Sequence, residues 1–423
     1  MNYIKSIIII FICCLTVGLD NIVYGANLND TNVAINGKIV DARNNKGIGS
    51  VDISLMGSNI VTISNSDGYF SLTCPTVSVG KVSFSIKGYS TVTVPLDSLR
   101  KGGNIIRLDR QAVELSEVVV YGGDPVKIVE EAIKKIPANY SLSNDLLSVF
   151  YRETIKKGRR FVGVSEAAID VYKTPYNKRE IAGDRVQIER GRRLVSQKSN
   201  DTIAVKILGG PNLAVCVDFV KNADVLLSEN ELSDYEFKMK NPELIDDRLQ
   251  YVIDFRPKVR REYAQFRGSL YIDIELMAFT RAEFEIDPGD KAKMTAAVLH
   301  KKPRGLRFNP QKVDFVVSYK QIKGRTYLNY IQNVMRFKCD MKRRLFSSAY
   351  TAYTEMVVVN REEGTEARIT RKDAFKPRQI FYDLVDQYWD EDYWSDYNII
   401  EPTESLEHAV EKLKKTGKTL SMQ

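Results

Sequence analysis

Apolar and polar residues alternate along short segments through most of the chain, with the two-residue period of half-buried β-strands. Val51–Leu55 shows the pattern clearly, because its odd positions are apolar and its even positions are polar. Between residues 34 and 110, turn residues interrupt such segments about every 8 to 12 positions. Ser66–Gly68 predicts one tight turn, since glycine accepts a positive φ. This first region therefore predicts a small antiparallel β-sandwich.

Three motifs in the first region resemble a known module. They are Gly37–Asp41, Ser66–Phe70 and Lys87–Tyr89. Together they resemble the carboxypeptidase regulatory-like domain, a transthyretin-like sandwich, over about residues 34–110. The segment that follows, Leu115–Tyr121, resembles the link between this module and the plug of TonB-dependent outer-membrane receptors in Bacteroidetes-type bacteria. The resemblance implies a β-sandwich, and the name of the module implies no peptidase activity.

A helix is predicted to open the second region, because Asp124 can cap it and Pro125 suits its first turn. Apolar residues then recur on one helical face at Val126, Val129, Ile133 and Ile136. Further apolar helices are predicted at residues 211–220 and 223–227. The alternating pattern predicts strands at residues 149–154, 161–172, 235–239, 249–255, 268–274, 280–286, 294–298, 312–319, 327–338 and 353–360.

The hairpin pattern in Arg267–Phe279 resembles one found in half-barrel envelope proteins similar to lipoprotein carriers. In those proteins a long curved antiparallel sheet wraps a helix and a hydrophobic cavity. The order of elements from the sandwich to this hairpin also resembles the periplasmic part of large Bacteroidetes outer-membrane proteins. The predicted fold class is mainly β: a transthyretin-like β-sandwich, followed by an α+β domain with a large curved antiparallel sheet (half-barrel) and packed helices.

The predicted domain organisation has five parts. They are a signal peptide at 1–25, the carboxypeptidase regulatory-like β-sandwich at 26–110, a linker at 111–123, the half-barrel α+β domain at 124–375, and an acidic-aromatic C-terminal segment with a tail helix at 376–423. We expect the sandwich and the half-barrel domain to fold independently.

The N-terminus has the pattern of a secretory signal peptide. Lys5 precedes the uncharged run Ile7–Val17, and small residues near Gly25 place cleavage before Ala26. A membrane anchor is the alternative, but Asp20 interrupts the apolar run before it reaches the ~20 residues that a span needs. The pair Cys13 and Cys14 lacks the small preceding residues of a lipobox, which leaves lipidation as a minor possibility. We therefore expect an exported protein, periplasmic or peripherally attached to the outer membrane, with no transmembrane span in the mature chain.

The charge balance does not indicate nucleic-acid binding. Lys and Arg number 62 against 54 Asp and Glu, a net charge of +8, and both signs are interspersed. The mature cysteines, Cys74, Cys216 and Cys339, show neither zinc-ligand spacing nor a disulfide framework, and one bridged pair remains open.

Histidine chemistry is confined to His300 and His408. His408 and Glu411 have the first spacing of a zinc carboxypeptidase, but no histidine follows to complete the ligand set. We expect no catalytic residues, no metal site, no cofactor and no zinc carboxypeptidase activity.

Three groups of residues are candidates for binding, each with a structural alternative. Tyr271, Phe284 and Phe315 either line a cavity or fill a core. Tyr388, Trp389 and Trp394, in the acidic-aromatic segment, either form a docking or sugar-stacking strip or staple the tail to the sheet, which we favour.

The third group is basic and contains Lys156, Lys157, Arg159 and Arg160. It either contacts an anionic surface or forms a solvated hairpin tip. Residues 185–193, also rich in arginine, are predicted as a loop.

The leading functional hypothesis is a noncatalytic periplasmic or outer-membrane-associated envelope factor. Its partner would be a lipid, a lipoprotein or an outer-membrane protein. Two alternatives remain open: a structural or surface interaction scaffold with no small ligand, and a carbohydrate-binding or carbohydrate-active protein.

We predict that the exported chain begins near Ala26, because the apolar run of the signal is short and is followed by small residues. N-terminal sequencing of the protein from the bacterial envelope checks this. An intact Met1 on cytosolic protein would contradict it.

Overall fold

The computed structural model describes residues 32–111, 123–195, 210–299, 305–341, 348–377, 379–389, 399–403, 406 and 408. The predicted signal peptide and Trp394 lie outside the described residues. The larger of two compact units comprises residues 34–73 and 79–423. In the smaller unit, Cys74 and Pro75 end a strand and a turn follows. In this turn the amide of Ser78 donates to the carbonyl oxygen of Pro75 at 2.9 Å.

Two sheets form the first region, with strand orders β4-β1-β7 and β3-β2-β5-β6. The elements are β1 (Asn32–Asp41), β2 (Asp52–Leu55), β3 (Val61–Ile63), β4 (Tyr69–Pro75), β5 (Lys81–Ser85), β6 (Val92–Pro95), α2 (Leu96–Leu99) and β7 (Asn104–Leu108). Gly68 has a φ of +87°, and a Cβ there would lie 2.3 Å from the carbonyl oxygen of Ile39. The predicted turn therefore requires glycine. Phe70 and Phe84 meet edge to face in the core, with ring centroids 5.4 Å apart.

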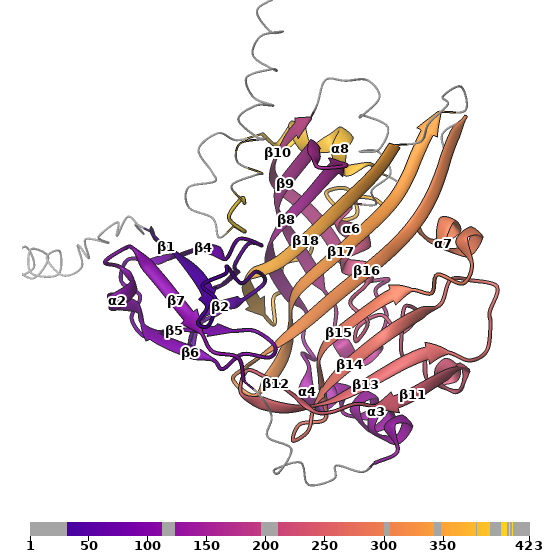
Figure 1. Cartoon of the computed structure of the whole chain (residues 1–423), viewed down its shortest axis with the longest axis horizontal. Helices are drawn as coiled ribbons and strands as arrows, with labels where there is room; N and C mark the ends of the chain where they lie inside the picture. The colour runs from indigo at the N-terminus through magenta and orange to yellow at the C-terminus, as the bar shows by residue number, and fades with distance from the viewer. Residues whose placement is uncertain are drawn as a thin grey trace, which may run out of the picture. The chain divides into compact units, whose positions relative to one another are not determined.

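The second region is built on one large antiparallel sheet, as predicted. Eleven strands of the described chain take part, in the order β10-β9-β8-β18-β17-β16-β15-β14-β13-β11, with β12 paired beside β13. They are β8 (Asp145–Lys157), β9 (Arg160–Lys173), β10 (Arg185–Val195), β11 (Tyr235–Met239), β12 (Glu243–Ile245), β13 (Arg248–Pro257), β14 (Phe266–Asp273), β15 (Ala278–Ile286), β16 (Leu306–Ile322), β17 (Arg325–Met341) and β18 (Ser348–Glu363). Strand direction turns progressively across the sheet, as sheet twist requires (Figure 1). The sheet is open, because β10 and β11 do not pair with each other.

Helices pack on one face of this sheet (Figure 1). They are α3 (Pro125–Lys134), α4 (Ile136–Asn139), η1 (Tyr176–Lys178), α6 (Gly210–Cys216) and η2 (Glu229–Asp234). The predicted start of α3 is confirmed, because the carboxylate of Asp124 accepts from the amide of Val126 at 3.0 Å and Pro125 occupies the first turn. The helix then buries Val129 and Ile133, two of the four predicted apolar residues, in the core.

Aromatic rings fill the space between these helices and the sheet. Phe219 is fully buried, and its ring centroid lies 5.6 Å from Phe279, 5.6 Å from Tyr319 and 6.4 Å from Phe284. Each of these contacts is close to edge-on, the arrangement that the ring quadrupoles favour.

Several sequence expectations are wrong, including the wholly antiparallel sandwich, because β1 and β7 pair in parallel. Residues 294–298 are not a strand but part of helix α7 (Lys291–Val298), because the carboxylate of Asp290 caps two amides at its start. The arginine-rich residues 185–193 are not a loop but lie in β10, where they pair with β9 around a bulge after Ile188. The helix predicted over residues 211–220 ends at Cys216, and Val217–Asn222 continues as buried turns. Residues 223–227, also predicted as a helix, form turns and a bend instead.

None of Cys74, Cys216 and Cys339 forms a disulfide bond. Among the described residues, no helix combines the length and the apolar character that crossing a bilayer demands.

Residues 399–403 lie between two parts of the larger unit. Thr62 of the sandwich donates to the carbonyl oxygen of Ile399 at 3.2 Å, and Arg152 of β8 donates to that of Ile400 at 2.5 Å. Ile400 is buried with Ile63 and Phe150. The sheet face that carries Arg152 is therefore covered here.

A C-terminal segment packs along β10. It consists of α8 (Phe381–Leu384) and η3 (Val385–Tyr388). Phe381 and Val385 are buried, and Tyr388 packs partly buried against the core. Trp389 is 52% exposed, so the expectation that it would be buried is wrong. The first residues of the segment anchor it to the core, whereas this tryptophan is exposed to solvent.

We predict that Phe381→Ala lowers the free energy of unfolding by ~3–5 kcal/mol, because it leaves a cavity in the core. Trp389→Ala, the matched control in the same segment, should change it by no more than ~0.5 kcal/mol. Urea denaturation of both variants measures the two effects. Equal destabilisation by both changes would contradict the assignment.

Glu153 places a buried carboxyl group on the helix face of the sheet. Glu153 of β8 is 3% exposed and accepts from the hydroxyl of Tyr151 at 2.7 Å. Burial raises the pKa of Glu153 from 4.5 to about 7. The folded state therefore holds a proton on Glu153 that the unfolded chain loses between pH 4.5 and about 7. Across this window, rising pH destabilises the fold.

We predict that Glu153→Gln removes this loss of stability, because a neutral amide does not have to ionise in the core. Between pH 4.5 and 7, the wild type should lose about 3 kcal/mol more than the variant. Chemical denaturation of both proteins at several pH values gives the difference. If the wild type and the variant lost the same stability over this pH range, ionisation of Glu153 would cost no folding free energy.

Candidate functional site

One row of paired residues crosses ten strands of the large sheet. From β11 to β10 it contains Lys238, Asp254, Ser269, Glu283, Val316, Gln332, Glu355, Arg152, Glu166 and Arg192. Residues paired across antiparallel strands share a face, and their sequence neighbours point the other way. The neighbours Phe255, Phe284 and Phe315 belong to the core on the helix face. The row therefore runs along the opposite, polar face.

The β10 end of the row is buried and ion-paired. Glu166 accepts from Arg152 and Arg192, each at 2.6 Å. Burial opposes ionisation of Glu166, but the two guanidinium groups outweigh it and lower the pKa of this carboxyl. Glu355 has weaker compensation, so burial raises its pKa.

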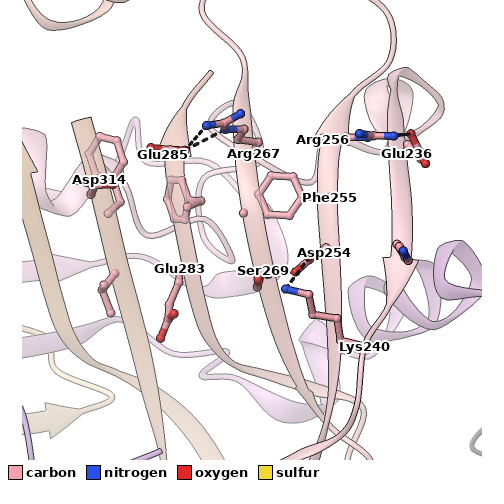
Figure 2. Close-up of a pocket in the computed structure, with 15 residues that line it drawn as sticks. Glu236, Lys240, Asp254, Phe255, Arg256, Arg267, Ser269, Glu283, Glu285 and Asp314 are labelled. Carbon is pink, nitrogen blue, oxygen red and sulfur yellow. Dashed lines mark hydrogen bonds and ion pairs between the residues drawn. The ribbon is translucent and has the colours of Figure 1, made fainter. Parts of the chain in front are cut away.

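The β11 end of the row opens into a groove of about 630 Å³. Its lining comes from β11, β13, β14, β15 and β16, and includes Glu236, Lys238, Lys240, Asp254, Arg256, Arg267, Ser269, Glu283, Glu285 and Asp314. Figure 2 shows the charged side chains that it labels on neighbouring strands of the sheet. Short side chains such as Ser269 and Val316 lie in the part of the row that lines the groove, which leaves a trough between the charged side chains.

Neighbouring strands pair their charges across the walls of the groove. Arg256 binds Glu236 at 2.8 Å, and Arg267 binds Glu285 at 2.7 Å, as Figure 2 shows. These pairs are partly exposed, with Arg256 at 70% and Arg267 at 47%. Pairs this exposed contribute little to folding, so they remain available to exchange partners.

A second set of contacts lies along the groove, at Asp254 and Glu283 of the row. Lys240 binds Asp254 at 2.7 Å, and the hydroxyl of Ser269 donates to the same carboxylate at 2.6 Å. Glu283 is bound by Arg281 at 2.7 Å and by Lys87, from the Lys87–Tyr89 motif of the sandwich, at 3.1 Å. Glu283 thus connects the groove lining to a lysine of the first region.

Ion pairing favours the charged forms of Glu283, Glu285 and Lys240 in the groove. Partial burial of Glu283 opposes ionisation, but Arg281 and Lys87 outweigh it and lower the pKa of this carboxyl. The pKa of Glu285 is lowered in the same way by Arg267 and Lys312. The hydrogen bond from Lys240 to Asp254 raises the pKa of that lysine. Five acidic and four basic residues line the groove, so its surface is charged but nearly neutral in sum.

The lining suits polar binding better than covalent chemistry. It contains no histidine or cysteine, and its one hydroxyl, on Ser269, donates to a carboxylate. No group of three His, Cys, Asp or Glu side chains in the described part of the chain is placed to hold a metal ion. His408 is described, whereas Glu411 lies outside the described residues. The charged side chains of the lining can instead form ion pairs and hydrogen bonds with a charged, extended ligand.

The structure separates the predicted aromatic residues. Phe284 and Phe315 are among the residues that line the groove, and their buried rings stack in the core with centroids 5.2 Å apart. Tyr271 is buried on the other face, where its hydroxyl accepts from Lys87 at 2.8 Å. Tyr388 and Trp389 lie on the C-terminal segment, beyond the groove lining.

The predicted basic cluster is at the turn between β8 and β9. The ammonium of Lys156 lies 4.3 Å from the ring centroid of Phe161, and that of Lys157 lies 5.6 Å from Tyr350. Burial lowers the pKa of Lys156. Arg159 and Arg160 are exposed. Two of the four cations therefore rest on aromatic rings.

Sequence reasoning did not identify the charged residues of the groove. A signal was present, since Tyr235–Met239 and Ala278–Ile286 place charges at every second position. It became a site only through the strand register, which brings Lys238, Asp254 and Glu283 into one row.

A comparison with solved structures found several similar chains. One is a putative outer membrane lipoprotein-sorting protein domain from Vibrio parahaemolyticus, at 12% identity over 59% of this chain and 95% of that one, with a TM-score of 0.27. Another is a DUF1329 family protein from Desulfovibrio piger, at 12% identity over 58% and 95%, with a TM-score of 0.26. A third is in the Pseudomonas aeruginosa MucA/MucB complex, at 9% identity over 57% and 100%, with a TM-score of 0.15. Likeness at this level does not establish a shared function.

No curated protein matched the chain. One family model did, that of the CarboxypepD_reg-like domain, over residues 35–120. The match covers the three motifs and both sandwich sheets and extends past the predicted end at residue 110. Residues 35–120 therefore resemble the CarboxypepD_reg-like domain.

Proposed function

We propose that the protein is an exported, noncatalytic envelope factor, periplasmic or peripherally attached to the outer membrane, that binds a partner protein through the charged groove. The observation that carries this proposal is the groove itself, with nine charged residues of both signs along one polar sheet face. Paired charges of both signs give orientation and selectivity for another polypeptide.

A protein partner suits the groove better than a lipid. An acyl chain would bury the charged groups of Arg267 and Glu285 without replacing their contacts with water, which is costly. On the other face, Phe219 and its aromatic neighbours pack between the helices and the sheet. The lipid hypothesis therefore has less support than the protein hypothesis.

An extended segment of the partner matches the shape of the groove. The trough passes over several strands and offers carboxylates and cations on both sides. A bound segment can replace the exposed Arg256–Glu236 and Arg267–Glu285 pairs by pairs of its own. Because exposed pairs contribute little to folding, this exchange costs the protein little stability.

The test begins by identifying the partner. A photo-crosslinking residue in place of Lys238, which is exposed in the groove, should capture a discrete envelope protein in living cells. The same residue in place of Arg107, exposed on the sandwich, is the matched control. Native mass spectrometry of the protein purified from its envelope should show no retained lipid.

We predict that the double variant Arg256→Glu, Arg267→Glu weakens binding of the captured partner by at least ~10-fold, because it reverses the charge of one groove wall. Arg107→Glu, a single charge reversal outside the groove, should bind as the wild type does. Calorimetric titration with the purified partner measures both. Unchanged binding by the double variant, or a stoichiometric lipid in the native mass spectrum, would overturn the proposal.

A further inference from the structure

Three ionic side chains meet in the core, away from the groove. Lys173 ends β9, Asp184 immediately precedes β10, and Asp218 lies in the buried turns after α6. Their side chains are 2%, 3% and 0% exposed. The proposed partner-binding function does not involve this cluster.

The ammonium nitrogen of Lys173 lies 2.8 Å from Oδ2 of Asp218. Aromatic residues surround this contact. The hydroxyl of Tyr319 donates to Oδ1 of Asp218 at 2.6 Å, and that of Tyr176 donates to Oδ2 at 2.8 Å. Tyr140 stacks on Tyr176 with ring centroids 5.3 Å apart. The amine and the carboxyl are thus held in contact, with two hydroxyl donors fixed on the carboxyl oxygens.

Asp184 is placed to accept a proton from Lys173. Its Oδ2 lies 3.4 Å from the ammonium nitrogen, while its Oδ1 accepts from the amide and the hydroxyl of Thr174 at 2.9 Å and 2.8 Å. Thr174 therefore holds Asp184 beside the amine, where Asp184 can accept a proton but is not itself a reactant.

We propose that Lys173 and Asp218 join in an intramolecular isopeptide bond, with Asp184 as the proton carrier. Asp184 takes one proton from the ammonium, and the free amine attacks Cγ of Asp218. As the C–N bond forms, the carbonyl electron pair moves onto Oδ1, where the Tyr319 hydroxyl stabilises it.

The tetrahedral intermediate then collapses. Oδ2 receives the proton held by Asp184 and a second proton from the nitrogen, the C–Oδ2 bond breaks, and water leaves. An ammonium and a carboxylate become an amide and one water molecule, so protons and electrons balance without an oxidant or a cofactor. Asp184 ends as the carboxylate it was at the start.

Two physical effects favour this bond. The fixed contact removes most of the entropy cost of bringing the reactants together. A buried ion pair is costly because both charges leave water, and the amide removes both charges.

Burial disfavours the charged form of Lys173, but Asp218 and Asp184 outweigh it and raise the pKa of this lysine. Lys173 therefore begins protonated, which is why a proton acceptor beside it is needed.

Intact-protein mass spectrometry of the folded wild-type chain is the decisive test. The measured mass should be lower than the mass of the mature sequence by one water molecule. A tryptic digest should contain a branched peptide that joins residues 173 and 218, and cleavage after Lys173 should be lost. An unmodified mass after prolonged incubation of the folded chain would overturn the proposal, whatever the variants do.

Variants assign the reacting groups. Lys173→Arg should keep the full sequence mass, and Asp184→Asn should slow the loss of water at least ~10-fold, within the range that a positioned proton-transfer group contributes. Lys221→Arg is the matched control, because Lys221 is a second buried lysine that donates to the carbonyl oxygen of Pro175 at 2.7 Å. It should lose water as the wild type does. Loss of water in Lys173→Arg would show that another pair reacts and would overturn the assignment.

Discussion

The strict alternation of side chains in the large sheet is the constraint on which the rest of the structure depends. A one-residue shift of any strand would bring its apolar side chains into the polar row and its charges into the core. Phe255, Phe284 and Phe315 face the helices because Asp254, Glu283 and Asp314 beside them face the groove. Core and candidate site are therefore two results of one register.

The fold could be predicted largely because its signals are local. The turn at Gly68 and the cap at Asp124 each depend on a few adjacent residues whose backbone requirements are specific. The errors arose where a short pattern was ambiguous. Lys291–Val298 buries only Met294, so its apolar residues do not separate a strand from a helix, and the cap at Asp290 decides.

The candidate site was harder to predict, because it depends on pairing between distant segments. Lys238 and Glu283 are 45 positions apart, and their row exists only once β11, β13, β14 and β15 are aligned. Burial also cannot be read from residue type alone. Trp389 is exposed, although the shorter apolar side chain of Val385 in the same segment is fully buried.

The segment that contains Val385 also affects how the protein behaves in a crowded compartment. An open sheet has two edge strands, and an unpaired edge is a template for aggregation with other chains. Along β10 the C-terminal segment packs so closely that a Cβ at Gly191 would lie 2.4 Å from a methyl group of Val385. At the other end, β11 is only five residues long and exposes Glu236 and Lys238. One edge is thus capped by the protein's own chain and the other is short and charged, which lets a sheet of this size remain open without recruiting strands from its neighbours.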